Sequence, residues 1–356
     1  MRVLLTGAAG FIGSTVADQL TTAGHLVIGL DLLLPAAHGS GPPAWAPAGL
    51  VVGDVRDEHL VADLLDDVDV VCHQAAMVGL GVHPTDAPEY VSHNVAGTAS
   101  VLSAMSRRGV HRLVLASSMV VYGEGGYRCP SDGVVRPGAR SAADLEQGIF
   151  DPPCPRCGRA LDWMTITERA PTDPRNTYAA TKLAQEHLAA SWAQQVTGSV
   201  TALRYHNVYG PRMPRDTPYA GVASIFRSAL ESGAAPQVYE DGRQMRDFVH
   251  VTDVAAANVL AVSRTCARPT EFGPEMLVCN VSSGAPRSVG ELADALAVAF
   301  DGPPARIVGG GRPGDVRHVV ADPTRARRSL GFVARVPFSE GVDDFARAPM
   351  RAPAGI

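Results

Sequence analysis

The sequence predicts an α/β fold: a doubly wound parallel sheet with a smaller C-terminal lobe and a cysteine-containing insertion. Two observations carry this prediction. Short apolar runs alternate with helical patterns through the first 125 residues, and the runs are apolar throughout, as in strands buried on both faces. A glycine-rich turn also joins the first run to the first helix. Such alternation is typical of a parallel sheet with helices on both sides.

The elements follow in order along the chain. Strands are predicted at Val3–Thr6, Leu26–Leu30, Leu50–Val52, Val68–Cys72, Leu113–Ala116 and Ser199–Arg204. Helices are predicted at Phe11–Ala23, Glu58–Leu65, Val91–Arg108 and Thr177–Gln195. The pattern breaks after the fifth strand, where Gly, Pro and Arg accumulate and no period is sustained, which indicates an insertion.

These elements suggest a large domain and a smaller lobe that closes over a substrate. The predicted boundaries are 1–204 for the large domain, with the insertion at 124–170 and a returning segment at 240–282, then 205–239 and 283–346 for the lobe and 347–356 for a tail. The tail is expected to fray from Arg347, as chain ends without a docking partner do.

Composition excludes several classes of function. The chain has 356 residues, 46% of them hydrophobic and 19% charged, and a net charge of -5. A general affinity for nucleic acid or an anionic membrane would require a basic surface, so neither partner is expected. No run of 18 apolar residues is present, so no membrane span is expected. The chain begins directly on a predicted strand, without a secretory pattern, which favours a cytoplasmic enzyme.

The turn after the first strand carries glycines at Gly7, Gly10 and Gly13, with Phe11 and Ile12 opening the helix. The first glycine allows a tight turn, the second admits a pyrophosphate, and the third lets helix and strand pack closely. The N-terminus of the helix then offers free N–H groups to phosphates. In this strand–turn–helix setting the motif predicts a Rossmann-type dinucleotide site.

Two acidic positions extend this site. Asp31 ends the second strand, 18 residues beyond Gly13. A carboxylate there accepts both adenosine ribose hydroxyls and repels a 2′-phosphate, which favours NAD over NADP; a solvated strand-end Asp is the alternative. Asp54 and Val55 follow the third strand, where an adenine contact is expected. Asp54 is alternatively an N-cap for a helix from Arg56 onward.

Tyr178 and Lys182 lie four residues apart, on one face of a predicted helix. A lysine ammonium about 5 Å from a phenol, at an effective dielectric near 20, is worth ~3 kcal/mol or about two pKa units. We therefore predict that Lys182 lowers the pKa of Tyr178 and makes it a base for a sugar hydroxyl. Ser118 follows the fifth strand, where its hydroxyl can share a proton with Tyr178; a loop cap is the alternative.

Together these motifs resemble the extended short-chain dehydrogenase/reductase family of NAD-dependent sugar-nucleotide epimerases and dehydratases. The resemblance runs over nearly the whole chain and also rests on His73–Ala76, Asn94, Tyr205–Asn207, Arg246–His250 and Arg312–Asp315. It implies cofactor contacts from Ala75, Ala76 and Asn94, and a contact of Lys182 with the nicotinamide ribose. NAD is the implied cofactor.

The resemblance also implies how a nucleotide-sugar substrate is held. Asn207 is expected to contact it, and Arg246 and Arg312 are expected to pair with its diphosphate, since guanidinium groups match phosphate oxygens. Ordinary surface arginines are the alternative. The family further suggests a homodimer built on the helices Val91–Arg108 and Thr177–Gln195.

The residues after Ser118 restrict the reaction. Dehydratases of this family place an acidic pair there, and sugar-acid decarboxylases keep a Glu at the second position, whereas this chain has Met119 and Val120. What remains is hydride transfer with one acid/base, as in epimerisation or ketone reduction. A tightly held NAD suits a 4-epimerase, which the sequence favours. A 4-ketoreductase is the alternative enzyme, and an NAD-sensing regulatory protein is the non-enzymatic alternative.

The insertion resembles the cysteine-bearing insert of dTDP-L-rhamnose 4-epimerases, which points to a dTDP- or other nucleotide-linked 6-deoxyhexose. It carries Cys129, Cys154 and Cys157, with Asp132 three residues after the first cysteine. A C-x-x-C pair followed by Gly is typical of a zinc knuckle, and tetrahedral zinc takes four ligands. The sequence leaves two alternatives open: a structural zinc site, or a lost site with free thiols.

Overall fold

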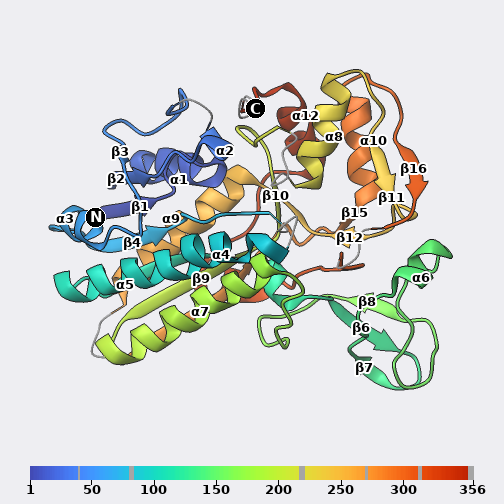
Figure 1. The fold of residues 1–356 in the computed structure, drawn as a ribbon, viewed down its shortest axis with the longest axis horizontal. Helices are drawn as coiled ribbons and strands as arrows, with labels where there is room; N and C mark the ends of the chain where they lie inside the picture. Colours follow the sequence, from blue (N-terminus) through green and yellow to red (C-terminus); the bar gives the residue numbers. More distant parts are fainter. Residues whose placement is uncertain (39–40, 80–83, 216–220, 269–271, 312–314, 352–356) are drawn as a thin grey trace.

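The centre of the computed structural model is a seven-stranded parallel sheet in the order β14-β9-β5-β4-β1-β2-β3 (Figure 1). The structure describes residues 1–38, 41–79, 84–215, 221–268, 272–311 and 315–351. The strands of the sheet are β1 (Arg2–Thr6), β2 (Leu26–Asp31), β3 (Val51–Val52), β4 (Val70–His73), β5 (Arg112–Ser118), β9 (Ser199–Tyr205) and β14 (Glu275–Val281).

Helices cover both faces of this sheet, because its strands are apolar on both sides. Leu4 and Leu5, neighbours in β1, belong to two different buried clusters, one on each face. The first cluster is completed by α1 (Phe11–Thr22), α9 (Val251–Ala267) and α11 (Thr324–Leu330). The second is completed by α3 (Glu58–Leu64), α5 (Gly97–Arg108) and α7 (Thr177–Val196). The predicted doubly wound α/β fold is confirmed.

Every predicted strand and helix of the large domain is present, with ends shifted by a few residues. The helix predicted over Val91–Arg108 is more complex than expected. It consists of a π-helical turn, Val91–Ala96, followed directly by α5, and the short helix α4 (Ala87–Tyr90) precedes it. The π-helical turn places Asn94 in the interior, where it is fully buried.

The smaller lobe has its own apolar core between three helices, at the upper right of Figure 1. Phe226, Leu296 and Phe345 are buried there, one from each helix. These helices are α8 (Val222–Glu231), α10 (Val289–Ala299) and α12 (Phe338–Arg347). Two short strand pairs join the lobe to the segment 240–282: β10 (Asn207–Tyr209) with β13 (Phe248–His250), and β12 (Met245–Arg246) with β15 (Arg287–Ser288). A third pair, β11 (Gln237–Tyr239) with β16 (Arg306–Gly309), lies within the lobe.

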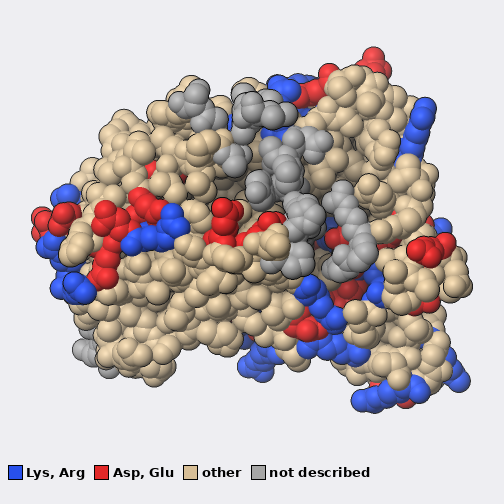
Figure 2. Space-filling view, in the orientation of Figure 1, with Lys and Arg blue, Asp and Glu red and all other residues tan. Residues whose placement is uncertain are grey.

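The insertion forms a three-stranded antiparallel sheet that projects at the lower right of Figure 1. Its elements are β6 (Gly126–Cys129), β7 (Gly133–Val135), β8 (Asp162–Met164) and α6 (Ala142–Glu146). Basic side chains gather along this margin of the molecule, while elsewhere on the same face acidic and basic groups are intermingled (Figure 2). The sequence did not predict these strands, because each has only three or four residues and lacks a sustained alternation.

The expectation that the chain frays from Arg347 is wrong for the residues just beyond α12. The Arg351 side chain is buried, and its guanidinium donates to the carbonyls of Ala9 and Ala37 at 2.9 and 3.0 Å. Those hydrogen bonds dock the tail against the glycine-rich turn of the large domain, which a composition-based expectation could not reveal. Among the residues that the structure describes, no helix is long and apolar enough to cross a bilayer.

Candidate functional site

The glycine-rich turn lies where the order of the sheet reverses, between β1 and β4. Gly7 has φ +67°, and a Cβ there would stand 2.8 Å from the amide nitrogen of Ala75. Thr6, the last residue of β1, accepts a hydrogen bond from that same nitrogen at 3.1 Å. The loops after β1 and β4 therefore touch at Ala75, at the place where open α/β sheets bind ligands. Ala76 follows directly in the second loop.

Helix α1 begins at this turn without a side-chain cap. Gly10 is its N-cap residue and makes no side-chain hydrogen bond, so the N–H groups of Phe11 and Ile12 lack intrahelical acceptors. A Cβ at Gly13 would stand 2.0 Å from the carbonyl oxygen of Gly7, which only glycine permits. Free donors at the end of a helix dipole fit a pyrophosphate.

Asp31 lies at the end of β2, beside this turn, and is buried. Its carboxylate accepts hydrogen bonds from the amides of Ala9 and Leu33, each at 2.9 Å. The His38 ring stands 3.4 Å away, and burial lowers the pKa of that histidine. Asp31 is thus held in place by the loop that it borders. The nearby His38 and Arg351 come from parts of the chain that sequence reasoning did not connect with this site.

Asp54 does not cap the helix that follows it. Asp57 does, by accepting from the amides of His59 and Leu60. The Asp54 carboxylate instead forms an ion pair with the Arg56 guanidinium, which holds its pKa below the usual range. Its neighbour Val55 is buried. The N-cap alternative for Asp54 is therefore wrong, since the helix begins at Glu58 and not at Arg56.

The structure brings the three predicted catalytic side chains together. Helix α7 begins at Thr177, capped by the Asn176 side chain, which accepts from the amide of Ala179 at 2.8 Å. Lys182 is buried one turn on, with its ammonium 6.0 Å from the ring centre of Tyr178. Ser118 ends β5, and its hydroxyl lies close enough to Tyr178 to lower the pKa of that phenol. Ser118 also caps the turn Met119–Tyr122, so the cap alternative is confirmed, and its catalytic role stays a prediction.

The prediction that Lys182 lowers the pKa of Tyr178 is wrong for the ligand-free chain. Burial raises the pKa of Tyr178 to about 12, opposed only in part by the Ser118 hydrogen bond. Burial also lowers the pKa of Lys182 to about 8. Removing both groups from water disfavours both charged forms, and this effect outweighs the opposing contributions of Ser118 at Tyr178 and of Glu186 at Lys182. Sequence spacing shows that two groups are close, but it does not show how completely the surrounding residues exclude water from them.

Lys182 is held by a buried network that sequence reasoning missed. Its ammonium donates to the carbonyl of Ala116 at 2.9 Å. One turn later, Glu186 accepts from the Ser117 hydroxyl at 2.5 Å and forms two hydrogen bonds to Arg204, at 2.9 and 2.7 Å. Two features of the sequence could have pointed to this network. Glu186 stands four residues after Lys182, and Lys182 is the single lysine of the 356-residue chain.

Asn94 connects two loops of the site. Its side-chain oxygen accepts from the amide of Met77 at 2.7 Å, and its nitrogen donates to the Met77 carbonyl and to Thr181, each at 2.9 Å. In the described chain these bonds tie the loop after β4 to helix α7. Asn94 therefore orients the residues around Tyr178. The cofactor contact that the resemblance implied for Asn94 stays a prediction.

The residues expected to bind substrate lie on the lobe side of the site. The side-chain oxygen of Asn207 is buried and has no hydrogen-bond partner among the described residues, so it is free to accept from a ligand. Arg246, in β12, donates to the carbonyls of Arg317 and Val316 at 2.8 and 2.7 Å. Arg312 lies outside the described residues.

The three cysteines of the insertion meet in one cluster with Asp132. The sulfurs of Cys129 and Cys157 are 3.5 Å apart. An Asp132 oxygen lies 3.4 Å from the Cys129 sulfur and 3.3 Å from the Cys154 sulfur. All four potential ligand atoms lie within 4.8 Å of one another. A disulfide requires about 2.05 Å between sulfurs, so these cysteines are thiols gathered around a common centre.

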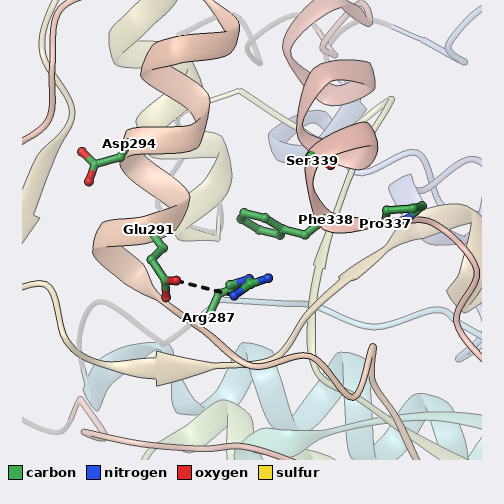
Figure 3. Close-up of a pocket in the computed structure, with 6 residues that line it drawn as sticks. All are labelled: Arg287, Glu291, Asp294, Pro337, Phe338 and Ser339. Carbon is green, nitrogen blue, oxygen red and sulfur yellow. Dashed lines mark ion pairs between the residues drawn. The ribbon is translucent and has the colours of Figure 1, made fainter.

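A separate hollow of about 480 Å3 lies between α10 and α12 (Figure 3). It is lined by Arg287, Glu291, Asp294, Pro337, Phe338 and Ser339. Arg287 pairs with Glu291 at 3.7 Å, and its guanidinium stands over the Phe338 ring at 5.7 Å. None of the residues around Tyr178 lines this hollow, so it is distinct from the candidate active site.

Comparison with known proteins agrees with this geometry. The chain is 33% identical to the dTDP-L-rhamnose 4-epimerase of Burkholderia thailandensis, over 96% of this chain and 93% of that protein. It is 32% identical to a UDP-glucose 4-epimerase of Mycolicibacterium smegmatis, over 96% of each.

Solved structures give the same picture. The UDP-glucose 4-epimerase of Thermus thermophilus in complex with NAD has a TM-score of 0.74 and 29% identity, covering 97% of this chain and 98% of that one. The UDP-glucose 4-epimerase of Bifidobacterium longum with NAD+ and UDP has a TM-score of 0.76 and 25% identity, covering 97% of each. The NAD dependent epimerase/dehydratase family matches residues 3–140 and 158–272. As the motifs predicted, the chain belongs to this family.

Proposed function

We propose that the protein is an NAD-dependent nucleotide-sugar 4-epimerase. The observation that carries this proposal is the convergence of Ser118, Tyr178 and Lys182 at the end of β5, on the same edge of the sheet as the glycine-rich turn. The relatives of the chain include 4-epimerases for dTDP-L-rhamnose and UDP-glucose. Met119 and Val120 occupy the positions after Ser118 and bring no acid for an elimination. The site therefore supports oxidation and reduction at one carbon.

The chain's own residues supply proton transfer and orientation. Tyr178 takes the proton of the sugar C4 hydroxyl and later returns it, while Ser118 hydrogen-bonds to the same oxygen. Bound NAD would supply a nicotinamide ring able to take up the hydride from C4 and give it back, and rotation of the keto sugar between the two transfers would expose its other face. Tyr178 would exchange the hydroxyl proton in both steps, although burial disfavours its phenolate form. Lys182 holds the ribose beside it.

The cofactor is proposed to lie along the turn after β1. The uncapped N-terminus of α1, with Gly7, Gly10 and Gly13, receives the pyrophosphate. Asp31 receives the adenosine ribose, and its negative charge disfavours a 2′-phosphate. Ala75 and Ala76 border the same space. Asp54 and Val55 are proposed as adenine neighbours, with the Asp54–Arg56 pair closing that end.

The substrate is proposed to be a dTDP- or other nucleotide-linked 6-deoxyhexose. The B. thailandensis relative is a dTDP-L-rhamnose 4-epimerase. The buried, unpartnered oxygen of Asn207 is an acceptor for a substrate hydroxyl or amide, and Arg246 and Arg312 are proposed to contact the diphosphate. Since NAD and nucleotide sugars are cytoplasmic metabolites, we place the enzyme in the cytoplasm.

A panel of dTDP-, UDP-, GDP- and CDP-sugars tests this proposal. The protein is incubated with each, and the products are separated by sugar-resolved chromatography. We expect one sugar to be converted to its C4 epimer without net consumption of NADH or NADPH. Stoichiometric consumption of reduced cofactor with a 4-keto sugar would identify a ketoreductase and contradict the proposal.

A homodimer is proposed through the helices Val91–Arg108, which comprises the π-helical turn and α5, and Thr177–Gln195, which lies in α7. In Figure 1, α5 and α7 lie next to each other on one face of the molecule, and Val91, at the start of this region, is 47% exposed although apolar. Light scattering on the purified protein is expected to give twice the 37.3 kDa chain mass. The monomer mass at micromolar concentration would contradict this assembly.

We also propose that the cluster Cys129, Asp132, Cys154 and Cys157 binds a structural zinc ion. Zinc bound at about 2.3 Å to sulfur and about 2.0 Å to oxygen in a tetrahedron places its ligands about 3.5–3.8 Å apart. The observed separations of 3.3 to 3.5 Å are close to these values. With four protein ligands the ion has no open position, so its role would be to hold the insertion together and not to catalyse.

Metal analysis tests the zinc proposal directly. Protein purified with added zinc is expected to hold about one ion per chain, and Cys157→Ser is expected to lose it. Cys266→Ser, a cysteine outside the insertion, is the matched control and should keep the metal. Asp132→Cys should retain zinc because it supplies a fourth thiolate. Equal zinc content in the parent and Cys157→Ser would contradict the assignment.

A further inference from the structure

The segment after the undescribed residues 312–314 carries a buried charge that plays no part in the proposed chemistry. Arg317 is fully buried, yet its guanidinium contacts three carboxylates. It donates to Asp151 of the insertion at 2.8 Å, and to Glu240 and Asp241, which directly follow β11, at 2.8 and 2.7 Å. Burying a guanidinium removes its charge from water, which costs free energy unless carboxylates pair with it. This residue therefore joins the insertion to the lobe.

The backbone of the same segment holds Arg246. The carbonyls of Val316 and Arg317 both accept from the Arg246 guanidinium, at 2.7 and 2.8 Å. His318 accepts from the amide of Met245 at 3.0 Å, and its other ring nitrogen lies 3.1 Å from Asp151. Any shift of residues 316–318 would therefore carry the Arg246 guanidinium with it.

Two residues of the insertion, Glu124 and Asp151, contact Arg317. Glu124, just before β6, accepts from the amide of Arg317 at 2.5 Å. Asp151 contacts the Arg317 side chain and is followed by Pro152, Pro153 and then the cluster residue Cys154. Two consecutive prolines fix φ and stiffen the connection. The position of Asp151 is therefore tied to the position of the cysteine cluster.

The family match omits this part of the chain. It ends at residue 140 and resumes at 158, so Asp151, Cys154 and Cys157 lie in the gap. The contacts of Asp151 with Arg317 and His318 are thus made by a segment outside the portion shared with the family, although they bear on Arg246 within it. The insertion is placed to influence the substrate side of the site and not the cofactor side.

We infer that the insertion is a metal-clamped brace that positions Arg246 for the diphosphate of the substrate. The inference rests on the proposed function, in which Arg246 contacts that diphosphate. Asp151 is a positioning residue: it acts through Arg317 and the carbonyls of residues 316 and 317. The cluster around Cys154 keeps Asp151 in place. Loss of the brace weakens binding of a nucleoside diphosphate and leaves the hydride and proton transfers at Tyr178 unchanged.

Calorimetric titration with dTDP, and in parallel with UDP, tests the brace. We expect Asp151→Asn to raise both dissociation constants about three- to tenfold, a modest effect because this carboxylate is partly exposed. We expect KM for the nucleotide sugar to rise by the same factor, with kcat and the affinity for NAD unchanged. Asp162→Asn removes an exposed carboxylate of β8 in the same insertion and is the matched control. We expect it to change neither the dissociation constants for dTDP and UDP nor KM for the nucleotide sugar.

A double-variant cycle tests the link to the cluster. Cys157→Ser should lose zinc and raise the dTDP dissociation constant. The double variant Cys157→Ser/Asp151→Asn should bind dTDP with the same affinity as the single variant that binds it more weakly, because both changes act through one connection. Cys266→Ser is the control. Independent, additive losses would contradict the link, and an unchanged dTDP affinity in folded Asp151→Asn would overturn the inference.

Two experimental results separate the role of the insertion from the proposed reaction. If no sugar is epimerised but Asp151→Asn still weakens dTDP binding, the reaction is wrong and the brace stands. If Arg246→Gln leaves dTDP affinity unchanged, the proposed role of Arg246 is wrong and the inference falls with it.

Discussion

Lys182 carries its charge where water is excluded, and this has a cost. Burial lowers its pKa from 10.5 to about 8, which corresponds to a penalty of up to about 3 kcal/mol on the folded, charged form. The penalty is full below pH 8, where both folded and unfolded chains are protonated. It declines between about 8 and 10.5, where the folded chain releases its proton first, and it disappears above that range.

We therefore predict that Lys182→Met raises the free energy of unfolding at pH 7 by about 1–3 kcal/mol, less whatever the lost hydrogen bond to Ala116 contributes. The gain should shrink as the pH rises toward 10. Urea denaturation at several pH values measures it. Because Lys182 is the single lysine, its pKa is also readable from one labelled side-chain NMR signal. A pKa near 10.5 and no stabilisation would contradict the buried, charged state.

Tyr178 is the group on which proton transfer depends. We predict that Tyr178→Phe lowers kcat at least ~10²-fold, the scale of a lost general acid/base, while the affinity for NAD is kept. Steady-state kinetics and NAD titration measure the two effects. Tyr239→Phe, which alters a partly exposed tyrosine of β11, is the control and should retain its rate. Full activity in Tyr178→Phe would overturn the assignment.

Asp31 should set the choice between NAD and NADP. Asp31→Asn removes the negative charge while keeping an oxygen that can accept from the amides of Ala9 or Leu33. We predict that this variant weakens NAD and weakens NADP less, so that the preference for NAD narrows. Fluorescence titration with both reduced cofactors measures the ratio. Losses of equal size for NAD and NADP would argue against a ribose role.

At the residue scale, the sequence predicted which side chains form the site but not how deeply those side chains are buried. The sequence located Tyr178, Lys182 and Ser118, because motif spacing and strand ends are local features. It gave the wrong direction for the pKa of Tyr178, because desolvation depends on residues far along the chain. Tyr90, whose ring lies 6.3 Å from that of Tyr178, is an example.

At the element scale, the start of α7 matters for catalysis. Asn176 caps this helix two residues before Tyr178, so its loss would loosen the first turn, where the phenol is carried. We predict that Asn176→Ala lowers the free energy of unfolding by about 1 kcal/mol and lowers kcat more than it changes KM. Thermal unfolding and kinetics measure these.

Asn176→Asp supplies an equivalent acceptor and should restore both properties. An unaltered kcat in an Asn176→Ala protein that has lost stability would mean that the first turn does not position Tyr178.

Element prediction succeeded where long periodic patterns exist and failed where contacts are made at a distance. The strands β1, β2, β4, β5 and β9 were found because each is apolar throughout. The three strands of the insertion were missed, because three or four residues give too little pattern. The docking of Arg351 against Ala9 was missed for another reason: the contact joins residues 342 positions apart.

At the scale of the whole molecule, three parts of the chain are joined by contacts between residues distant in sequence. The sheet domain presents the glycine-rich turn and Tyr178, β12 pairs with β15 and carries Arg246, and the insertion reaches β12 through Arg317. Sequence alone predicted that three such parts exist. It could not predict that the cysteine cluster and Arg246 are joined by Asp151, since that connection is made entirely by side chains.

The most direct test of the account follows the hydrogen at C4. A nucleotide sugar that the enzyme converts is prepared with deuterium at C4 and incubated in ordinary water, and the epimer is analysed by mass spectrometry and NMR. We expect deuterium to remain at C4 of the product, with no net change in NADH. Loss of the label to water, or its appearance in released cofactor, would contradict a 4-epimerase that removes and returns one hydride.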